Sequence, residues 1–139
     1  MLTLKQIIAK TPSNRIEGAR YVKPLRVQSG YNEDGQAFIA AQTYSTHEWS
    51  PTLHTWVRSQ NRPKYVTMIT FLDKKLHCKV SCSCADFMFR SEFALHSKGA
   101  ADIEYSDGSP PDFTNPQLRP QTCKHVVRLY FMIQDKLKR

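Results

Sequence analysis

The sequence predicts an α+β fold with a small antiparallel sheet made of hairpins, an inserted helix and a C-terminal helix. Three observations predict this fold class. Apolar and polar residues alternate in several short segments that are separated by turn sequences, which is typical of strands. A helical period begins near residue 86 and again near residue 123. Cysteine and histidine residues gather in two short motifs, one next to a predicted strand and one next to a predicted helix.

The length and composition indicate one globular domain over residues 1–139. A chain of 139 residues with 40% hydrophobic and 23% charged residues can bury its own core. No apolar run is long enough to span a bilayer, and the first residues lack the pattern of a secretory signal. We therefore expect reduced thiols, no export by a signal peptide, no membrane contact and no small-molecule substrate.

The positive charge is concentrated in the first half of the chain. The net charge is +8, and residues 1–79 hold 12 basic and 5 acidic side chains, whereas residues 80–139 hold 8 and 7. We divide the domain into a basic, mostly-β part at 1–75 and a nearly neutral part at 76–139. The basic part is either a solvated surface or a face for nucleic acid or an anionic partner.

The elements predicted in the first part are short. "LTLKQIIAK" has apolar residues at helical spacing and Thr3 as a cap, which predicts a helix. "ARYVKPLRVQSG" predicts an edge or kinked strand because it contains Pro24. A turn at Asp34 and Gly35 predicts a hairpin within 31–44. For 45–63, which contains two prolines, we expect a loop and one short strand.

A second hairpin and two helices are predicted further along. Segments 64–71 and 76–84 form the hairpin. One face of the first arm carries Tyr65, Thr67, Ile69 and Phe71, and one face of the second carries Leu76, Cys78, Val80, Cys82 and Cys84. Residues 86–100 predict a helix with Phe89, Phe93 and His96 near one face. Residues 102–122, with four prolines, predict a long loop. The last helix runs from about residue 123 to 138 on the sequence period, and its expected apolar stripe is Val126, Val127, Tyr130, Ile133 and Leu137.

Two cysteine and histidine pairs predict a metal site. Cys82 and Cys84 are poor disulfide partners because one residue separates them. In an extended strand their side chains point to the same side and their Cα atoms lie roughly 6.6 Å apart, so both thiolates can reach one ion. Cys123 and His125 can converge in the same way at a helix start. The four ligands make a tetrahedral Cys3His site that favours one structural zinc ion with no open position for substrate. The alternative is four ordinary core residues.

The pattern C-x-C followed by C-x-H resembles the SWIM zinc finger, and Cys82, Cys84, Cys123 and His125 match its ligand positions. The apolar "VVRLYF" after the histidine is similar to the helix of such fingers, so the resemblance covers about residues 76–133. The insertion at 85–122 is longer than usual, and Ala85 stands where a proline often follows. The resemblance implies a DNA-binding or protein-interaction module of a larger machine, such as a transposase or an ATPase.

A second resemblance is to SWIM-bearing structural proteins of tailed bacteriophages. The segments "CSCADFMFRSEFAL", "IEYSDGSPPDFTNPQLRP" and "CKHVVRLY" are similar to parts of such proteins. This resemblance implies that the protein lies in a virion if it is encoded by a phage, and in the cytoplasm otherwise.

The remaining cysteine and histidines receive other interpretations. Cys78 lies about 13 Å along the strand from Cys82, so we expect a buried free thiol, with exchange for Cys82 as the alternative. His96 is either a half-buried helix residue or a second-sphere or substitute ligand. The other histidines, which lack partners at ligand spacing, are expected on the surface or in loops; they are His47, His54 and His77.

No pattern of residues predicts catalysis. The acidic cluster of the long loop (Asp102, Glu104, Asp107 and Asp112) suits Mg²⁺ in principle, but we expect a solvated loop without a partnering base. The sequence contains no phosphate-binding loop, no nucleophile elbow and no dinucleotide motif. We therefore expect a protein that is not an enzyme.

Two functions compete. Basic residues interleaved with aromatic ones suggest nucleic-acid or partner binding, and the candidates are Arg58, Arg62, Lys64, Lys74 and Lys75. The nearly neutral second half and the long proline-rich loop instead favour contacts with other protein subunits. We expect a zinc-stabilised structural subunit of a large assembly, a tailed-phage virion component, and keep a SWIM-type nucleic-acid-binding protein as the alternative.

Overall fold

The computed structural model describes residues 1–138, and it confirms the α+β fold. A four-stranded antiparallel sheet has the order β1-β2-β5-β6, and β3 pairs with β4 beside it. The strands are β1 (Val22–Tyr31), β2 (Ala37–Ser45), β3 (His47–Ser50), β4 (Thr55–Arg58), β5 (Tyr65–Phe71) and β6 (Cys78–Cys82). The helices are α1 (Leu4–Ala9), α2 (Ser13–Gly18), α3 (Glu92–His96) and α4 (Lys124–Ile133).

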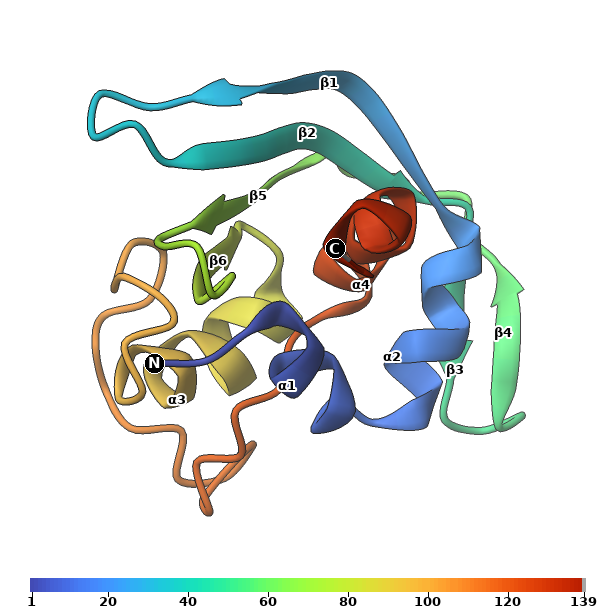
Figure 1. Cartoon of the computed structure of the whole chain (residues 1–139). Helices are drawn as coiled ribbons and strands as arrows, with labels where there is room; N and C mark the ends of the chain where they lie inside the picture. The colour runs from blue at the N-terminus through green and yellow to red at the C-terminus, as the bar shows by residue number, and fades with distance from the viewer. Residues whose placement is uncertain (139) are drawn as a thin grey trace.

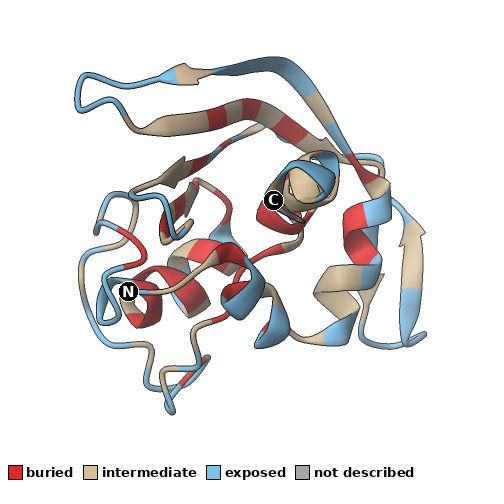
Figure 2. Cartoon of the chain, in the orientation of Figure 1, coloured by how far each residue is buried: buried red, intermediate tan, exposed pale blue. Residues whose placement is uncertain are grey.

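The helices cover one face of the sheet. α4 lies directly beneath the strands, α1 and α3 lie further below, and α2 stands beside the β3–β4 pair (Figure 1). The buried residues gather between these layers, whereas β1 and the long loop are largely exposed (Figure 2). No helix in residues 1–138 combines the length and the apolar character that crossing a membrane requires.

The first helix forms as predicted, and a second one was missed. The Thr3 side chain accepts a hydrogen bond from the Gln6 N–H, and the Gln6 side chain accepts one from the Thr3 N–H at 2.8 Å, which completes a capping box. α2 begins after Pro12, whose carbonyl accepts hydrogen bonds from the N–H groups of Arg15 and Ile16. Six residues without an apolar period gave no signal for α2 in the sequence.

Both predicted hairpins of the main sheet are confirmed. β1 pairs with β2 around a turn in which Gly35 has a φ of +75°, and β5 pairs with β6 with Ile69 opposite Val80. β1 is an edge strand, as Pro24 predicts, and its register shifts at a bulge between Leu25 and Gln28. The inward alternation of the β5–β6 hairpin is the predicted one.

Two other segments form hydrogen bonds with β6, the strand at the opposite edge of the sheet. The N–H of Cys78 donates to the carbonyl of Leu2 at 2.9 Å, and the N–H of Val80 donates to Ala100 at 3.0 Å. The start of the chain and the end of the inserted helical segment therefore hold β6 in place, and β6 carries the first metal-ligand candidate.

The segment 45–63 contains a hairpin instead of the expected loop and single strand. β3 pairs with β4 so that Trp49 lies opposite Trp56, with their ring centroids 5.8 Å apart. Trp56 also packs on Gly18, where an added Cβ would lie 2.3 Å from the indole ring. Four-residue strands are too short for a clear alternation, so cross-strand and tertiary contacts decide this pair.

The inserted helix forms, but its buried face is not the one that carries Phe89 and His96. A π-helix at Phe87–Ser91 precedes α3. The wider π turn shifts the phase of the following residues. As a result Phe87 and Leu95 are buried, whereas Phe89 is 60% exposed and His96 is exposed.

The last helix is confirmed over Lys124–Ile133 and continues as a 3-10 helix to Lys138. Val126 and Val127 of the predicted stripe are fully buried against the sheet. Leu129, which the prediction omitted, is equally buried. The apolar face of α4 is therefore wider than the predicted stripe.

The long loop lacks helices and strands, as predicted, and one buried carboxylate holds its first part. Glu92 is 0% exposed and accepts hydrogen bonds from the N–H groups of Glu104, Tyr105 and Ser106 at 2.9–3.1 Å. Backbone N–H groups that converge on an anion in this way compensate for its burial. Glu92 therefore gives an irregular segment a fixed start.

We predict that Glu92→Gln lowers the free energy of unfolding by about 2 kcal/mol, because a neutral amide weakens these charge-assisted hydrogen bonds. Urea unfolding measures the change, and hydrogen exchange should speed up at the amides of residues 104–106. The control is Glu104→Gln on the exposed surface, which should leave stability unchanged. Equal effects of the two substitutions would contradict the assigned role.

Candidate metal centre

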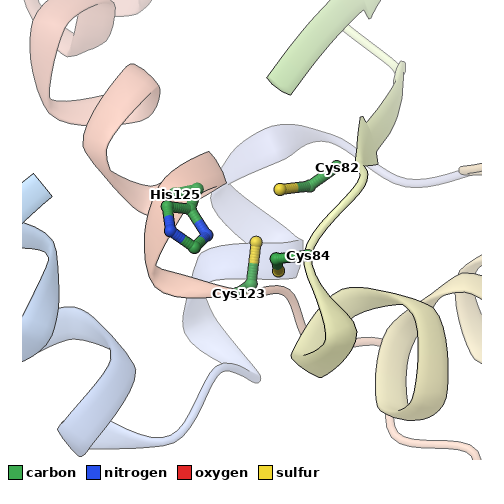
Figure 3. Close-up of side chains that lie close together, drawn as sticks. All are labelled: Cys82, Cys84, Cys123 and His125. Carbon is green, nitrogen blue, oxygen red and sulfur yellow. The ribbon is translucent and has the colours of Figure 1, made fainter. Parts of the chain in front are cut away.

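The structure brings the four predicted ligands together. The ligand atoms of Cys82, Cys84, Cys123 and His125 lie within 4.8 Å of one another, and all four residues are buried. The sulfur atoms of Cys82 and Cys123 and one edge of the His125 ring turn toward the same space (Figure 3). The predicted site residues therefore form one cluster able to coordinate a metal ion.

The end of β6 aims the first two cysteines. Cys82 is the last residue of the strand, and Ser83 still pairs with Val66, whose carbonyl accepts from the Ser83 N–H at 3.1 Å. This additional hydrogen bond, one residue beyond the end of β6, keeps the chain extended, so the side chain of Cys84 lies on the same side as that of Cys82. The carbonyl of Cys84 then accepts a hydrogen bond from the Met88 N–H, and the chain turns into the π-helix.

The start of α4 aims the other two ligands. Cys123 is the N-cap residue, with φ −89° and ψ 167°, and its side chain caps no backbone group of the helix. Its thiol is thus available to the cluster, and His125 follows in the first turn. A helix N-terminus also favours the negative charge of a thiolate. The helix start therefore suits both ligands.

The imidazole of His125 fits a metal ligand. It is 3% exposed, and neither of its ring nitrogens has a hydrogen-bond partner among the described residues. Burial, with a smaller contribution from Lys124, lowers the pKa of His125 to about 3, so the ring is neutral at pH 7. Buried polar atoms without a partner are rare, and a metal ion supplies one.

The thiols fit the same ion. Burial raises the pKa of Cys82 and Cys123 well above the ordinary value, so both are protonated at neutral pH unless a cation stabilises the thiolates. Outer contacts are already in place: the Thr67 hydroxyl lies 3.4 Å from the Cys82 sulfur, and the Phe87 N–H donates to the Cys84 sulfur at 3.4 Å. Such contacts orient metal ligands.

One side of the cluster faces a cavity of about 440 Å³. Cys84, Cys123 and His125 line it, together with both tryptophans of the chain, whereas Cys82 does not. Lys124 also lines the cavity. Its ammonium group lies 4.7 Å from the Trp56 ring centre and donates hydrogen bonds to the Ser45 hydroxyl and to the carbonyl of His47. Sequence reasoning missed this lysine; its place between two ligands was the available signal.

The other cysteine and histidines lie outside the cluster. Cys78 is a fully buried free thiol, as predicted, and burial raises its pKa to about 12. His96 is exposed rather than half-buried, and its Nδ1 donates a hydrogen bond to the carbonyl of Ala101 at 3.0 Å. His47 stacks on Tyr21, and His77 pairs with a carboxylate of the β5–β6 turn.

The five basic candidates do not form one patch. Arg58 and Arg62 line a common hollow of about 430 Å³, and Lys64 precedes β5. Lys74 and Lys75 lie in the turn after β5, about 20 Å away along a seven-residue strand. The four carboxylates of the acidic loop are exposed, as expected, and Asp102 pairs with Lys79 at 2.9 Å.

No protein-family model, curated protein or solved structure matches this chain. The chain is an α+β domain with a buried cluster of three cysteines and one histidine that can bind one metal ion. The SWIM resemblance and the choice of zinc stay predictions, which the ligand types and their spacing support.

We predict one metal ion per purified chain by elemental analysis, and its loss in a Cys82→Ser/Cys84→Ser variant. Because the ion links the end of β6 to the start of α4, its removal by a chelator should speed hydrogen exchange in 85–122 and in α4 together. Cys78→Ala is the matched control and should keep the metal. A metal-free wild type would rule out the site.

We also predict that metal affinity falls by about 1,000-fold for each unit by which the pH drops below neutrality. The pKa values of all three thiols, Cys84 included, are raised, so each cysteine loses a proton on binding, three in all, whereas His125 is already neutral. Competition with a chromophoric chelator at several pH values gives the slope. A slope near zero would mean that the thiolates exist before the metal binds.

Proposed function

We propose that this chain is a non-enzymatic, zinc-stabilised structural subunit of a large assembly. The observation that carries the proposal is the ligand set: four buried protein ligands have their ligand atoms within 4.8 Å of one another. Bound to one zinc ion, they would fill a tetrahedral shell and leave no position for a substrate. Such zinc sites stabilise folds and do not activate water. Zinc is the ion that three thiolates and an imidazole prefer.

Exposed apolar side chains support contacts with other protein subunits. The outer face of the main sheet has no covering helix (Figure 1) and exposes Leu25, Val66 and Met68. Phe89 and Phe113 are exposed on the inserted segment. Large apolar groups on a surface often mark contact sites. The resemblance to structural proteins of tailed bacteriophages makes a virion the assembly that we propose.

The alternative is a SWIM-type nucleic-acid-binding protein. A net charge of +8 favours it, as do Arg58 and Arg62, which line one hollow near the chain's two tryptophans. The split between these arginines and the lysines of the β5–β6 turn argues against one continuous basic groove.

We predict that the chain, purified from the cells or particles that naturally contain it, sediments after nuclease treatment with a complex far larger than itself. Fluorescence anisotropy with labelled DNA at several salt concentrations tests the alternative, for which Arg58→Gln/Arg62→Gln should reduce the salt slope by about 2. A monomer that binds DNA tightly with a steep salt dependence would replace the proposed assembly role.

A further inference from the structure

One exposed apolar surface belongs to the inserted segment. Phe113 is 99% exposed and Phe89 is 60% exposed. Both border a hollow of about 480 Å³ whose wall includes Pro110 and Pro111. The carboxylate of Asp112, next to Phe113, makes no ion pair or hydrogen bond among residues 1–138. We call Phe89, Pro110, Pro111, Asp112 and Phe113 the loop surface.

The loop surface is held in shape before any partner binds. The side chain of Asn115 donates to the carbonyls of Arg90 at 2.8 Å and Arg119 at 2.9 Å, and its backbone N–H donates to Pro111 at 3.0 Å. The Thr114 hydroxyl donates to the carbonyl of Phe89. Phe113 therefore projects from a fixed backbone, so its burial in a contact costs little ordering entropy.

A complementary surface lies after β4. Arg58, Ser59, Gln60 and Arg62 line a hollow of about 430 Å³, which we call the arginine hollow. Arg62 is oriented by the hydrogen bond from its Nε to the Ser59 carbonyl at 3.0 Å. Arg58 is exposed and makes no side-chain hydrogen bond or ion pair among the described residues. Guanidinium groups bind carboxylates and stack on aromatic rings.

The two surfaces match in charge and chemistry. The loop surface offers a carboxylate beside an aromatic ring, and the arginine hollow offers two guanidinium groups around a recess. The acidic side chains near the loop surface, Asp107 and Asp112, disfavour nucleic acid or an anionic membrane there. The loop lies on the left of the molecule and β4 on the right (Figure 1), so one chain cannot join its own two surfaces.

We propose that the chain associates head to tail with a second copy of itself, by docking the loop surface of one copy into the arginine hollow of the next. This inference rests on the proposed structural role and specifies its partner. Each copy keeps one free surface of each kind, so the contact repeats and builds a ring or a filament rather than a two-fold dimer. Phe113 is the apolar anchor, and Asp112 meets Arg58 and Arg62.

Two variants separate the surfaces. The loop-blocked chain carries Asp112→Ala and Phe113→Ala, and the hollow-blocked chain carries Arg58→Glu and Arg62→Glu. By sedimentation velocity the wild type should form oligomers larger than dimers, less at high salt, and each variant should weaken association at least about tenfold. Mixed together, the two variants should form one-to-one dimers and nothing larger, because only one intact pair of surfaces remains.

Matched controls make the result specific. Tyr31→Ala removes another aromatic residue, 77% exposed on β1, and should leave association unchanged. Metal content and circular dichroism check that every variant is folded. A wild type that stays monomeric up to about 1 mM overturns the proposal, as does a mixture of the two variants without dimers.

The same experiments separate this inference from the assembly role. A monomeric chain that still sediments with a large native complex overturns only the self-association. A chain that self-associates but never sediments with a native complex overturns only the role in a larger assembly.

Discussion

The fold depends on the convergence of three sulfur atoms and one imidazole between the end of β6 and the start of α4. This point holds three buried thiols and a histidine whose two ring nitrogens have no hydrogen-bond partner among residues 1–138. With a bound metal ion, it becomes a cross-link between two pairs of ligands, and 38 residues of the chain separate Cys84 from Cys123. The insertion at 85–122 begins and ends at this cross-link. A bound metal ion would therefore close a long loop, which in its absence is ordered by its own contacts alone.

In the later part of this insertion, residues 102–122, polar anchors replace a hydrophobic core. Glu92 accepts hydrogen bonds from backbone N–H groups at the start of the loop. The side chain of Asn115, in the later part of the loop, donates hydrogen bonds to a carbonyl of the π-helix and to that of Arg119. These contacts fix the backbone but require no apolar side chain to turn inward. The large apolar residue Phe113 consequently stays on the surface, where it is free to act on a partner.

The cluster of three cysteines and one histidine also connects with the β3–β4 hairpin. Lys124, between the two ligands of α4, reaches Ser45, His47 and the ring of Trp56. Trp56 in turn packs on α2 at Gly18. A displacement of the start of α4 would therefore disturb the hairpin and α2, so the candidate ligands position more of the molecule than the insertion alone.

Features that depend on near neighbours in the chain could be predicted from the sequence. Thr3 and Gln6 define the first cap, alternation defines the β5–β6 hairpin, and the spacing of Cys82 to Cys84 and Cys123 to His125 defines the two halves of the cluster. The sequence did not predict α2, the β3–β4 pair, the phase of the inserted helix or the burial of Glu92. These features rest on contacts between distant residues, such as Gly18 with Trp56 and Arg15 with Asp86 at 2.8 Å. Local periodicity carries no information about such contacts, because they form only when the elements pack.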